Sequence, residues 1–402
     1  MAVTRSAKPV SSDQDVGGFT AGAAAAGVRD GTARRLDVAL IVSDRPCAAA
    51  GVFTTNQVIA APCVVTRRHI EKGPIRAIVV NSGNANACTG ELGERDAVAM
   101  AQATALKIGC DPHEVAVAST GVIGVPLPIE RIASAVREIE PRQAGWGDVA
   151  RAIMTTDTRQ KTIGVEVPLA GGVVHLRGIA KGAGMIHPNM ATLLAFVLTD
   201  ARVSVDDLRR ITARAADRSF NEISADGDTS TNDTLLVLAN GASGLEPRGD
   251  ELPTFAGAVD FVCESLARQI VADGEGVTKV FEVRVKGAAS DDDAKRAART
   301  ITTSNLVKTA IHGADPNWGR ILAAAGRSGA KVDQTKASVH IAEVAVFAHG
   351  SPRAFDADAV RRMFEQRDIT IGVDLGVGSE AAHVWGTDLS AEYVRINADY
   401  TT

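Results

Sequence analysis

Short apolar runs with the two-residue period of a β-strand recur along the whole chain and alternate with longer helical stretches. In Val280–Lys286 apolar and charged side chains alternate strictly, which predicts a strand with one face in water. The other predicted strands are Leu36–Val42, Ile75–Val80, Val115–Ser119, Thr162–Val167, Val173–Ile179, Thr192–Leu198 and Thr234–Ala239. The predicted helices are Arg95–Ile108, Ile129–Ile139, Val205–Ser219, Phe255–Val271, Asp291–Thr303 and Ala357–Gln366.

This pattern indicates an α/β or α+β fold with a mixed sheet. Ser204 and Ser290 each precede acidic residues and are expected to cap helices. Only 4% of the residues are aromatic and 38 are glycine, so the core must consist of small aliphatic side chains. No repeat or Pro/Ser-rich linker marks a boundary, and we expect a continuous, interdigitated architecture.

The charge balance excludes several classes of protein. Lys and Arg number 43 against 48 Asp and Glu, so no basic surface for nucleic acid or anionic membranes is expected. The five cysteines are far apart and form no CxxC pair, which argues against a zinc ribbon, a redox motif or a disulfide scaffold. No apolar run is long enough for a membrane span or a signal core, and we expect a cytoplasmic protein.

Familiar catalytic motifs are absent or out of context. Gly376–Ala381 fits a GxGxx[G/A] fingerprint, but the residues after it look extended instead of helical, so a β-turn is the better interpretation. The eight histidines show no paired metal-ligand spacing, and we expect no metal site. His187 lies in a Pro-containing loop and is interpreted as a loop residue. The sequence lacks the GxSxG motif that is typical of serine hydrolases.

Runs of small polar residues, Gly and Asn follow several predicted strands. Each alone is typical of a turn, but together they indicate loops that converge on a polar small-molecule pocket. These runs are Asn81–Gly90, Ser119–Gly124, Met154–Thr158, Asp226–Thr234 and Gly313–Arg320. In the second run a glycine after an apolar strand lets backbone N–H groups face a ligand oxygen, as in an oxyanion hole.

The segment from Lys181 to Phe196 is the most informative part of the chain. Its glycines and its proline predict a loop and a turn, after which Thr192 occupies the first position of an apolar strand. A β-branched residue is an ordinary strand starter there. If the Ala191–Thr192 bond were cut, however, Thr192 would become an N-terminal nucleophile, and its α-amine (pKa about 7.7–8.0) could take the hydroxyl proton near neutral pH.

At these residues the sequence resembles the bifunctional glutamate N-acetyltransferases of arginine biosynthesis, also called ornithine acetyltransferases. The resemblance covers essentially the whole chain and rests on NSGNANACTG, STGVIG, AIMTTDT, AKGAGMIHPNMATLLAFVLTDA, DGDTSTNDT, GEGVTK, LVKTAIHGADPNWGR and YVRINADYTT. Leu193 and Gln160 depart from the family pattern, which has Met and Pro there, and neither touches the chemistry.

The resemblance implies self-cleavage between Ala191 and Thr192. The resulting α chain (1–191) and β chain (192–402) would interdigitate in one structural unit, assembled as α2β2. The implied fold is the mixed-sheet α/β sandwich of the self-processing aminopeptidases. In the implied ping-pong reaction, N-acetylornithine acetylates Thr192 and the acetyl group then passes to glutamate, without a cofactor. Some members of the family also use acetyl-CoA as a donor, and the sequence leaves open whether this chain does.

The resemblance also assigns roles to single residues. Thr192 is the nucleophile, and Thr120 and Gly121 stabilise the oxyanion. Residues implied to contact substrate are Thr155, Lys181, Thr192, Glu275, Asn397 and Thr402. The residue types suit such a ligand, because a lysine can hold a carboxylate and a glutamate an ammonium group.

Two other functions stay open at this point. One is a self-processing amidohydrolase or aminopeptidase with the same nucleophile, in which water removes the acyl group. The other is an uncleaved protein that binds a small molecule without chemistry. A specialised relative that serves another biosynthetic pathway is less consistent with the near-complete match to the arginine-pathway motifs.

Overall fold

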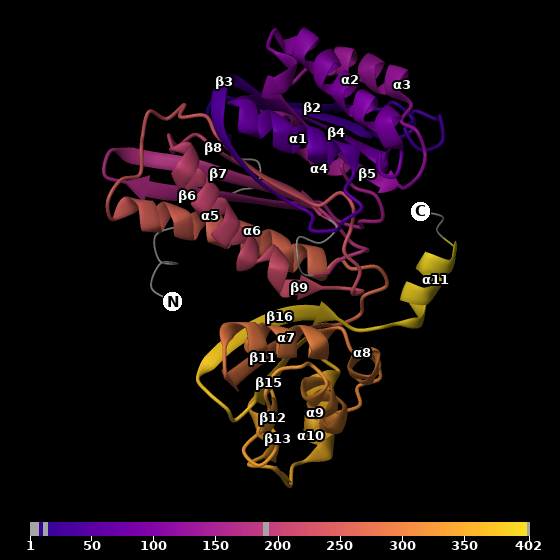
Figure 1. Cartoon of the computed structure of the whole chain (residues 1–402), viewed down its shortest axis with the longest axis vertical. Coiled ribbons are helices and arrows are strands. Elements are labelled where there is room, and N and C mark those ends of the chain that lie inside the picture. Colours follow the sequence, from indigo (N-terminus) through magenta and orange to yellow (C-terminus); the bar gives the residue numbers. More distant parts are fainter. Residues whose placement is uncertain (1–7, 11–14, 188–192, 400–402) are drawn as a thin grey trace.

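The computed structural model describes residues 8–10, 15–187 and 193–399. Figure 1 shows two lobes, a larger one above and a smaller one below. The strands of the larger lobe are β1 (Lys8–Val10), β2 (Phe19–Ala24), β3 (Val38–Phe53), β4 (Ile75–Asn84), β5 (Val115–Val122), β6 (Lys161–Leu169), β7 (Gly172–Lys181), β8 (Leu194–Thr199) and β10 (Thr234–Ala239). Its helices are α1 (Ala61–Lys72), α2 (Gly90–Ile108), α3 (Ile129–Glu138), α4 (Trp146–Ala152), α5 (Val205–Asp217) and α6 (Glu251–Val271).

The strands of the larger lobe form two sheets that share the long strand β3. The hydrogen-bonded order is β1-β6-β7-β8-β10-β3-β4-β5, and β2 also pairs with β3. Pairs β4–β5 and β8–β10 are parallel and the other pairs are antiparallel, so the sheet is mixed as predicted. The pairing of β3 with β4 shifts register between Val42 and Cys47, where the strand passes from one sheet to the other.

Alternating side chains place the two sheets face to face. Ile78 and Val80 of β4 and Leu236 and Leu238 of β10 lie in one buried cluster between the sheets. The residues between them in the sequence point outward: those of β4 pack on α2 and α3, and those of β10 on α5 and α6. Because strand side chains alternate between faces, this gives four layers, helix–sheet–sheet–helix. The expected mixed-sheet α/β sandwich is confirmed.

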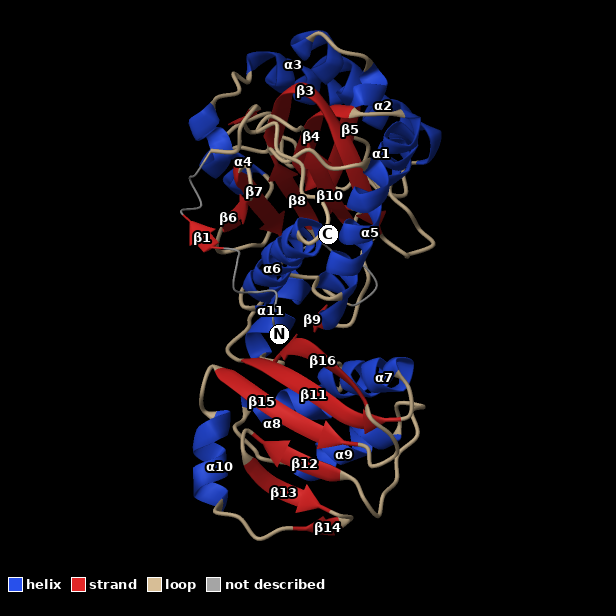
Figure 2. Cartoon of the chain, turned by 90° about the vertical axis from the view of Figure 1, so that its left-hand side faces the viewer, coloured by secondary structure: helices blue, strands red, loops and turns tan. Residues whose placement is uncertain are grey.

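The smaller lobe has a core of its own. Its strands are β9 (Ile223–Ser224), β11 (Val280–Ala288), β12 (Ser338–Ile341), β13 (Val344–Ala348), β14 (Ser351–Pro352), β15 (Asp368–Asp374) and β16 (Glu380–Thr387), in the order β14-β13-β12-β15-β11-β16-β9. Helices α7 (Asp291–Thr302), α8 (Asn305–His312), α9 (Trp318–Gly326) and α10 (Ala357–Phe364) pack on this sheet. In Figure 2 the sheet faces the viewer, with α8 and α9 behind it. This second core forms without any linker composition that would mark it in the sequence. The expected division into interdigitating chains 1–191 and 192–402 stays a prediction.

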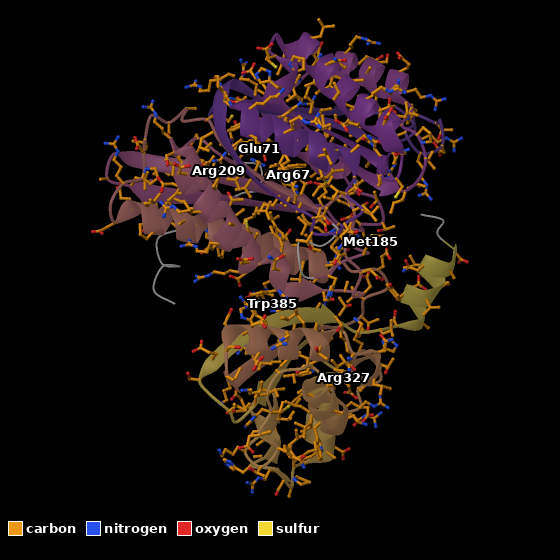
Figure 3. The ribbon with its side chains drawn as sticks, viewed as in Figure 1. Arg67, Glu71, Met185, Arg209, Arg327 and Trp385 are labelled. Atoms are coloured by element: carbon orange, nitrogen blue, oxygen red, sulfur yellow. The ribbon has the colours of Figure 1, made fainter. Side chains whose placement is uncertain are left out.

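The chain crosses between the lobes several times. Strand β9 follows α5 of the larger lobe but pairs with β16 of the smaller one. Trp385 of β16 is labelled at the junction in Figure 3, and its ring lies 5.9 Å from the guanidinium carbon of Arg268 on α6. After β16, helix α11 (Ala391–Asp399) returns to the larger lobe. The segment after residue 192 also supplies β8 and β10, which lie between β7 and β3.

Several local expectations can be compared with the structure. The hydroxyls of Ser204 and Ser290 accept hydrogen bonds from the backbone N–H of Asp207 and Asp293, so both predicted caps are confirmed. Gly376 has φ of +69° and is followed by strand β16, which confirms the turn. The five cysteines are all free. In the part of the chain that the structure describes, no helix is long and apolar enough to cross a membrane.

Candidate active site

A polar cavity of about 130 Å³ opens at one edge of the sandwich, where β4, β5 and β7 end and β10 begins. Parallel and antiparallel neighbours bring these strand ends together although they are far apart in the sequence. The cavity is lined by Ala85, Thr120, Gly121, Ile123, Thr155, Thr156, Lys181, Gly184, Met185, Ser230, Thr231, Asn232, Glu275 and Asn397.

The cavity brings together every predicted site residue that the structure describes. Thr120, Gly121, Thr155, Lys181, Glu275 and Asn397 all line it. Ala191, Thr192 and Thr402 lie outside the described residues. The assigned role of each residue stays a prediction. These residues are far apart in the sequence, and only the tertiary fold brings them to one cavity.

The predicted convergence of polar loops is largely confirmed. Asn81–Gly90, Ser119–Gly124, Met154–Thr158 and Asp226–Thr234 each contribute residues to the cavity. The expectation for Gly313–Arg320 was wrong, because this run lies in the smaller lobe and lines no part of the cavity. Instead, the side chain of Asn317 accepts a hydrogen bond from the backbone N–H of Arg320 and caps α9.

The close packing of strands β4 and β5 requires a glycine at the position of Gly121. It has φ of +136° and lies opposite Gly83 in the parallel pair β4–β5, next to a register shift. A Cβ at Gly121 would lie 2.3 Å from the carbonyl carbon of Gly83 and 2.4 Å from the amide nitrogen of Asn84. Only glycine permits this approach, which holds the backbone of Thr120 and Gly121 at the cavity.

Lys181 connects two cavity walls. Its Nζ donates a hydrogen bond of 3.2 Å to the hydroxyl of Thr120, joining the end of β7 to the end of β5. The side chain is buried, and burial lowers the pKa of Lys181, whereas Asp157 opposes this effect. A buried ammonium group beside a polar cavity is suited to hold a carboxylate of a ligand.

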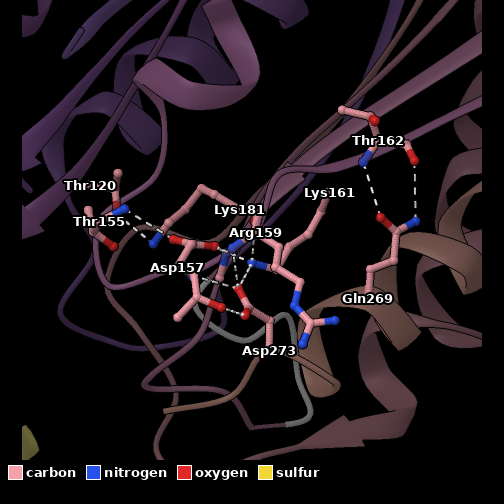
Figure 4. A network of polar contacts seen from close by, with 11 residues as sticks. Thr120, Thr155, Asp157, Arg159, Lys161, Thr162, Lys181, Gln269 and Asp273 are labelled. Atoms are coloured by element: carbon pink, nitrogen blue, oxygen red, sulfur yellow. Dashed lines mark hydrogen bonds and ion pairs between the residues drawn. The ribbon is translucent and has the colours of Figure 1, made fainter. Parts of the chain in front are cut away.

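A buried charge network behind Lys181 was not singled out from the sequence (Figure 4). Lys161 Nζ lies 2.6 Å from Asp157 Oδ1 and 2.6 Å from Asp273 Oδ2. Burial alone would raise the pKa of Asp157, but Lys181 and Lys161 outweigh it and lower the pKa to about 2. Asp157 and Asp273 are 116 residues apart in the sequence, so only the MTTDT motif around Asp157 could have drawn attention to this network.

Glu275 and Asn397 also line the cavity and contact each other. Asn397 Nδ2 donates to Glu275 Oε2 at 2.9 Å, so helix α11 reaches the site through this contact. The backbone N–H of Glu275 donates to the carbonyl of Ala183 at 3.1 Å. A Cβ at Gly184 would lie 2.5 Å from the Glu275 carboxylate oxygens, which explains why a glycine stands there.

Asp226 holds the loop that leads from β7 towards residue 188. Its carboxylate accepts hydrogen bonds from the backbone N–H groups of Met185 (2.5 Å) and Ile186 (2.9 Å). Burial raises the pKa of Asp226 to about 6. His187, which the sequence placed in a loop, is there in the structure, with Nδ1 3.2 Å from the hydroxyl of Ser224.

Asp233 is a further buried carboxylate, and sequence reasoning assigned it no role beyond its place in the Asp226–Thr234 run. Its Oδ1 accepts a hydrogen bond of 3.1 Å from the backbone N–H of Leu193. Its Oδ2 is buried and has no hydrogen-bond partner among the described residues. Burial raises the pKa of Asp233 well above its ordinary value. The described residues contain no group of three or more His, Cys, Asp or Glu side chains that could hold a metal ion.

Comparison with known proteins identifies the family. A sequence profile described as "ArgJ family" matches residues 20–402. The chain belongs to the ArgJ family. It is 49% identical over 390 residues to the arginine biosynthesis bifunctional protein ArgJ of Symbiobacterium thermophilum, covering 96% of this chain and 97% of that protein. The ArgJ of Dehalococcoides mccartyi is 49% identical over 395 residues, covering 96% of both chains. The resemblance inferred from the sequence and the enzyme class, an acetyltransferase of arginine biosynthesis, are thereby confirmed.

Two solved ArgJ-type structures also match. One is the crystal structure of the arginine biosynthesis bifunctional protein ArgJ from Bacillus halodurans, with 41% identity and a TM-score of 0.49, covering 51% of this chain and 98% of that one. The other is ornithine acetyltransferase from Mycobacterium tuberculosis, complexed with ornithine, with 35% identity and a TM-score of 0.41, covering 47% of this chain and 100% of that one.

Proposed function

We propose that this chain transfers the acetyl group of N-acetylornithine to glutamate through an acetyl-threonine intermediate on Thr192. The observation that carries the proposal is the single cavity lined by Thr120, Gly121, Lys181 and Glu275, which unites groups suited to an oxyanion, a carboxylate and an ammonium ion. N-acetylornithine and glutamate each carry charged groups at both ends, and a pocket with one buried cation and one carboxylate matches them.

The chemistry proceeds in two balanced steps. The hydroxyl of Thr192 attacks the acetyl carbonyl, its proton passes through the Thr192 α-amine to the leaving nitrogen, and ornithine departs. The neutral α-amine of glutamate then attacks the acetyl-threonine ester, and its proton passes through the Thr192 α-amine to the threonine oxygen. The C–O bond breaks, the hydroxyl is regenerated, and N-acetylglutamate leaves. The free α-amine comes from self-cleavage at Ala191–Thr192, which is part of the proposal.

Thr120 has a defined part in this scheme. Since Lys181 Nζ donates to the Thr120 oxygen, the hydroxyl proton of Thr120 is free to point elsewhere. Directed into the cavity, that proton stabilises the tetrahedral oxyanion, and the nearby ammonium of Lys181 strengthens it as a donor.

The two fragments that self-cleavage would create are expected to stay together. Strands β8 and β10 lie between β7 and β3, so separation would break sheet pairings on both sides and open the buried clusters. An α2β2 assembly and a cytoplasmic location stay proposals that rest on the resemblance.

The experiment follows isotope-labelled acetyl from N-acetylornithine. Label in N-acetylglutamate, formed faster than free acetate and lost in Thr192→Ala, supports the proposal. Release of acetate that outpaces transfer identifies a hydrolase instead, and no turnover at all identifies a binding protein. Acetyl-CoA serves as a second donor in parallel reactions, because the names of the curated relatives call them bifunctional. If the enzyme uses acetyl-CoA, it also acetylates glutamate directly, as a second activity.

A further inference from the structure

Asp157 does not line the cavity, but its carboxylate accepts hydrogen bonds from the backbone of two segments that do. The backbone N–H of Thr155 donates to Asp157 Oδ2 at 3.0 Å, and the backbone N–H of Gly182 donates to Asp157 Oδ1 at 2.7 Å. Thr155 lines the cavity, and Gly182 directly follows Lys181, which also lines it. One carboxylate therefore fixes the spacing between two predicted substrate contacts.

The same carboxylate also favours the positive charge of Lys181, although the two side chains form no ion pair within 4 Å. Among the charged groups that face Lys181, Asp157, Glu275 and Asp233 favour its ammonium form, whereas Lys161 and burial oppose it. These groups come from the loop before β6, the loop after α6, the loop before β10 and strand β6 itself. Asp157 has the largest favourable effect of the three carboxylates.

Lys161 and Asp273 complete the network (Figure 4), and neither residue lines the cavity. Lys161 Nζ bridges Asp157 and Asp273, and Asp273 also accepts hydrogen bonds from the backbone N–H groups of Thr158 (2.9 Å) and Arg159 (3.2 Å) and from the Thr158 hydroxyl. Asp273 is thus as buried as Asp157, but the hydrogen bonds and the ion pair of its side chain go to Thr158, Arg159 and Lys161, which do not line the cavity.

We propose that Asp157 is a positioning residue that holds Thr155 and Lys181 at a fixed spacing and keeps the positive charge of Lys181 available to a substrate carboxylate. This inference rests on the proposed function, which assigns Lys181 to that carboxylate. Asp157 acts through Lys181 and the backbone and does not touch the reacting atoms.

The test compares Asp157→Asn with Asp273→Asn. Both variants remove one carboxylate from the same buried network, and both are expected to lower thermal stability. Only Asp157→Asn removes the negative charge next to Lys181. It should therefore move the alkaline limb of the binding profile down by about 1 pH unit, which weakens glutamate binding about tenfold at pH values above the wild-type limb. Asp273→Asn should keep the wild-type limb.

Lys161→Gln should shift the alkaline limb of the glutamate-binding profile in the opposite direction. This variant removes a positive charge that disfavours the ammonium form of Lys181, so the alkaline limb should move to higher pH. A purely structural role of the network would not move the alkaline limb down in one variant and up in the other. If Asp157→Asn does not fold, Lys161→Gln alone tests whether charge in the network controls Lys181.

The readout is glutamate binding by calorimetry from pH 6 to 10, together with kcat and KM of acetyl transfer. Opposite shifts of the limb, with Asp273→Asn unchanged, support the inference. Equal effects of Asp157→Asn and Asp273→Asn, or an unmoved limb in both charge variants, overturn it. A wild-type protein that binds glutamate but transfers no acetyl group refutes the proposed function, and the binding profiles still decide the inference. A wild-type protein that does not bind glutamate overturns both.

Discussion

The ammonium group of Lys181 donates a hydrogen bond of 3.2 Å to the hydroxyl of Thr120. This contact joins residues that are 61 positions apart and links the end of β7 to the end of β5. It leaves the hydroxyl proton of Thr120 able to point elsewhere, and the proposed function supplies a ligand oxygen as its acceptor. In the proposed reaction, the charge that binds substrate and the donor that stabilises the transition state are therefore in direct contact.

Thr120→Ala should slow acetyl transfer by roughly 10²–10³ in kcat, the usual loss when one oxyanion donor is removed. Thr120→Ser keeps the hydroxyl and should retain most of the activity. Steady-state rates of N-acetylornithine turnover provide the measurement. A Thr120→Ala enzyme within twofold of wild type would remove Thr120 from the oxyanion hole.

Gly184→Ala should weaken substrate binding without unfolding the protein. The new Cβ would lie 2.5 Å from the carboxylate oxygens of Glu275, and this flexible side chain can move away, which breaks its contact with Asn397. We expect KM to rise about tenfold with a small change in thermal stability. Gly147→Ala is the control, because its Cβ meets no atom within 4 Å. An unchanged KM would show that the position of Glu275 does not matter for binding.

Gly121→Ala should destabilise the fold, since its Cβ would press against the backbone of Gly83 at 2.3 Å. We expect a loss of roughly 1–3 kcal/mol in the free energy of unfolding, as for other overpacked sites. Gly124→Ala separates the two causes of strain: it also has positive φ, +82°, but its Cβ meets nothing within 4 Å. Equal losses in both variants would show that backbone conformation, and not contact with β4, requires Gly121.

Asp226 predicts a dependence of stability on pH. Burial raises its pKa from 3.8 to about 6, so the folded state binds more protons than the unfolded state between these values. The stability of wild type relative to Asp226→Asn should therefore fall by up to roughly 3 kcal/mol as pH rises from about 3 to about 7, and then stay constant. Urea unfolding of both proteins across this range measures the difference. Parallel profiles would contradict the assigned pKa.

Elements with a regular pattern could be predicted well from the sequence. Strand β10 has the predicted bounds, Thr234–Ala239, because every side chain in it is buried and the run is uniformly apolar. Strand β3 was predicted to end at Val42 but continues to Phe53. The intervening Asp44, Arg45 and Pro46 are typical of a turn, and here they occupy an exposed bend where the strand changes sheets.

Helices that depend on tertiary contacts were missed. The apolar and β-branched residues at the start of Ala61–Lys72 suggest no helix, but Pro62 fits the first turn and Val65 packs in the core beneath α2. Helix α9 begins at Trp318, inside a run that looked like a loop, because Asn317 caps it. In both cases packing against distant elements outweighs local preference.

The candidate site could be predicted because its residues lie in recognisable motifs, but the groups that support them could not. The carboxylate of Asp157 accepts hydrogen bonds from Gly182 and Lys161, and that of Asp233 accepts one from Leu193, which is 40 residues away. Whether a carboxylate is a solvated surface charge or a buried partner depends on folding, and neither sequence spacing nor residue type reveals it.

Self-cleavage at Ala191–Thr192 is the central claim, since it creates the amine on which the proposed reaction depends. Intact mass and N-terminal sequencing of freshly purified protein test it most directly. The account predicts two fragments of about 20 and 22 kDa, the second beginning at Thr192. A single 41.8 kDa chain in a preparation that transfers acetyl groups would contradict it.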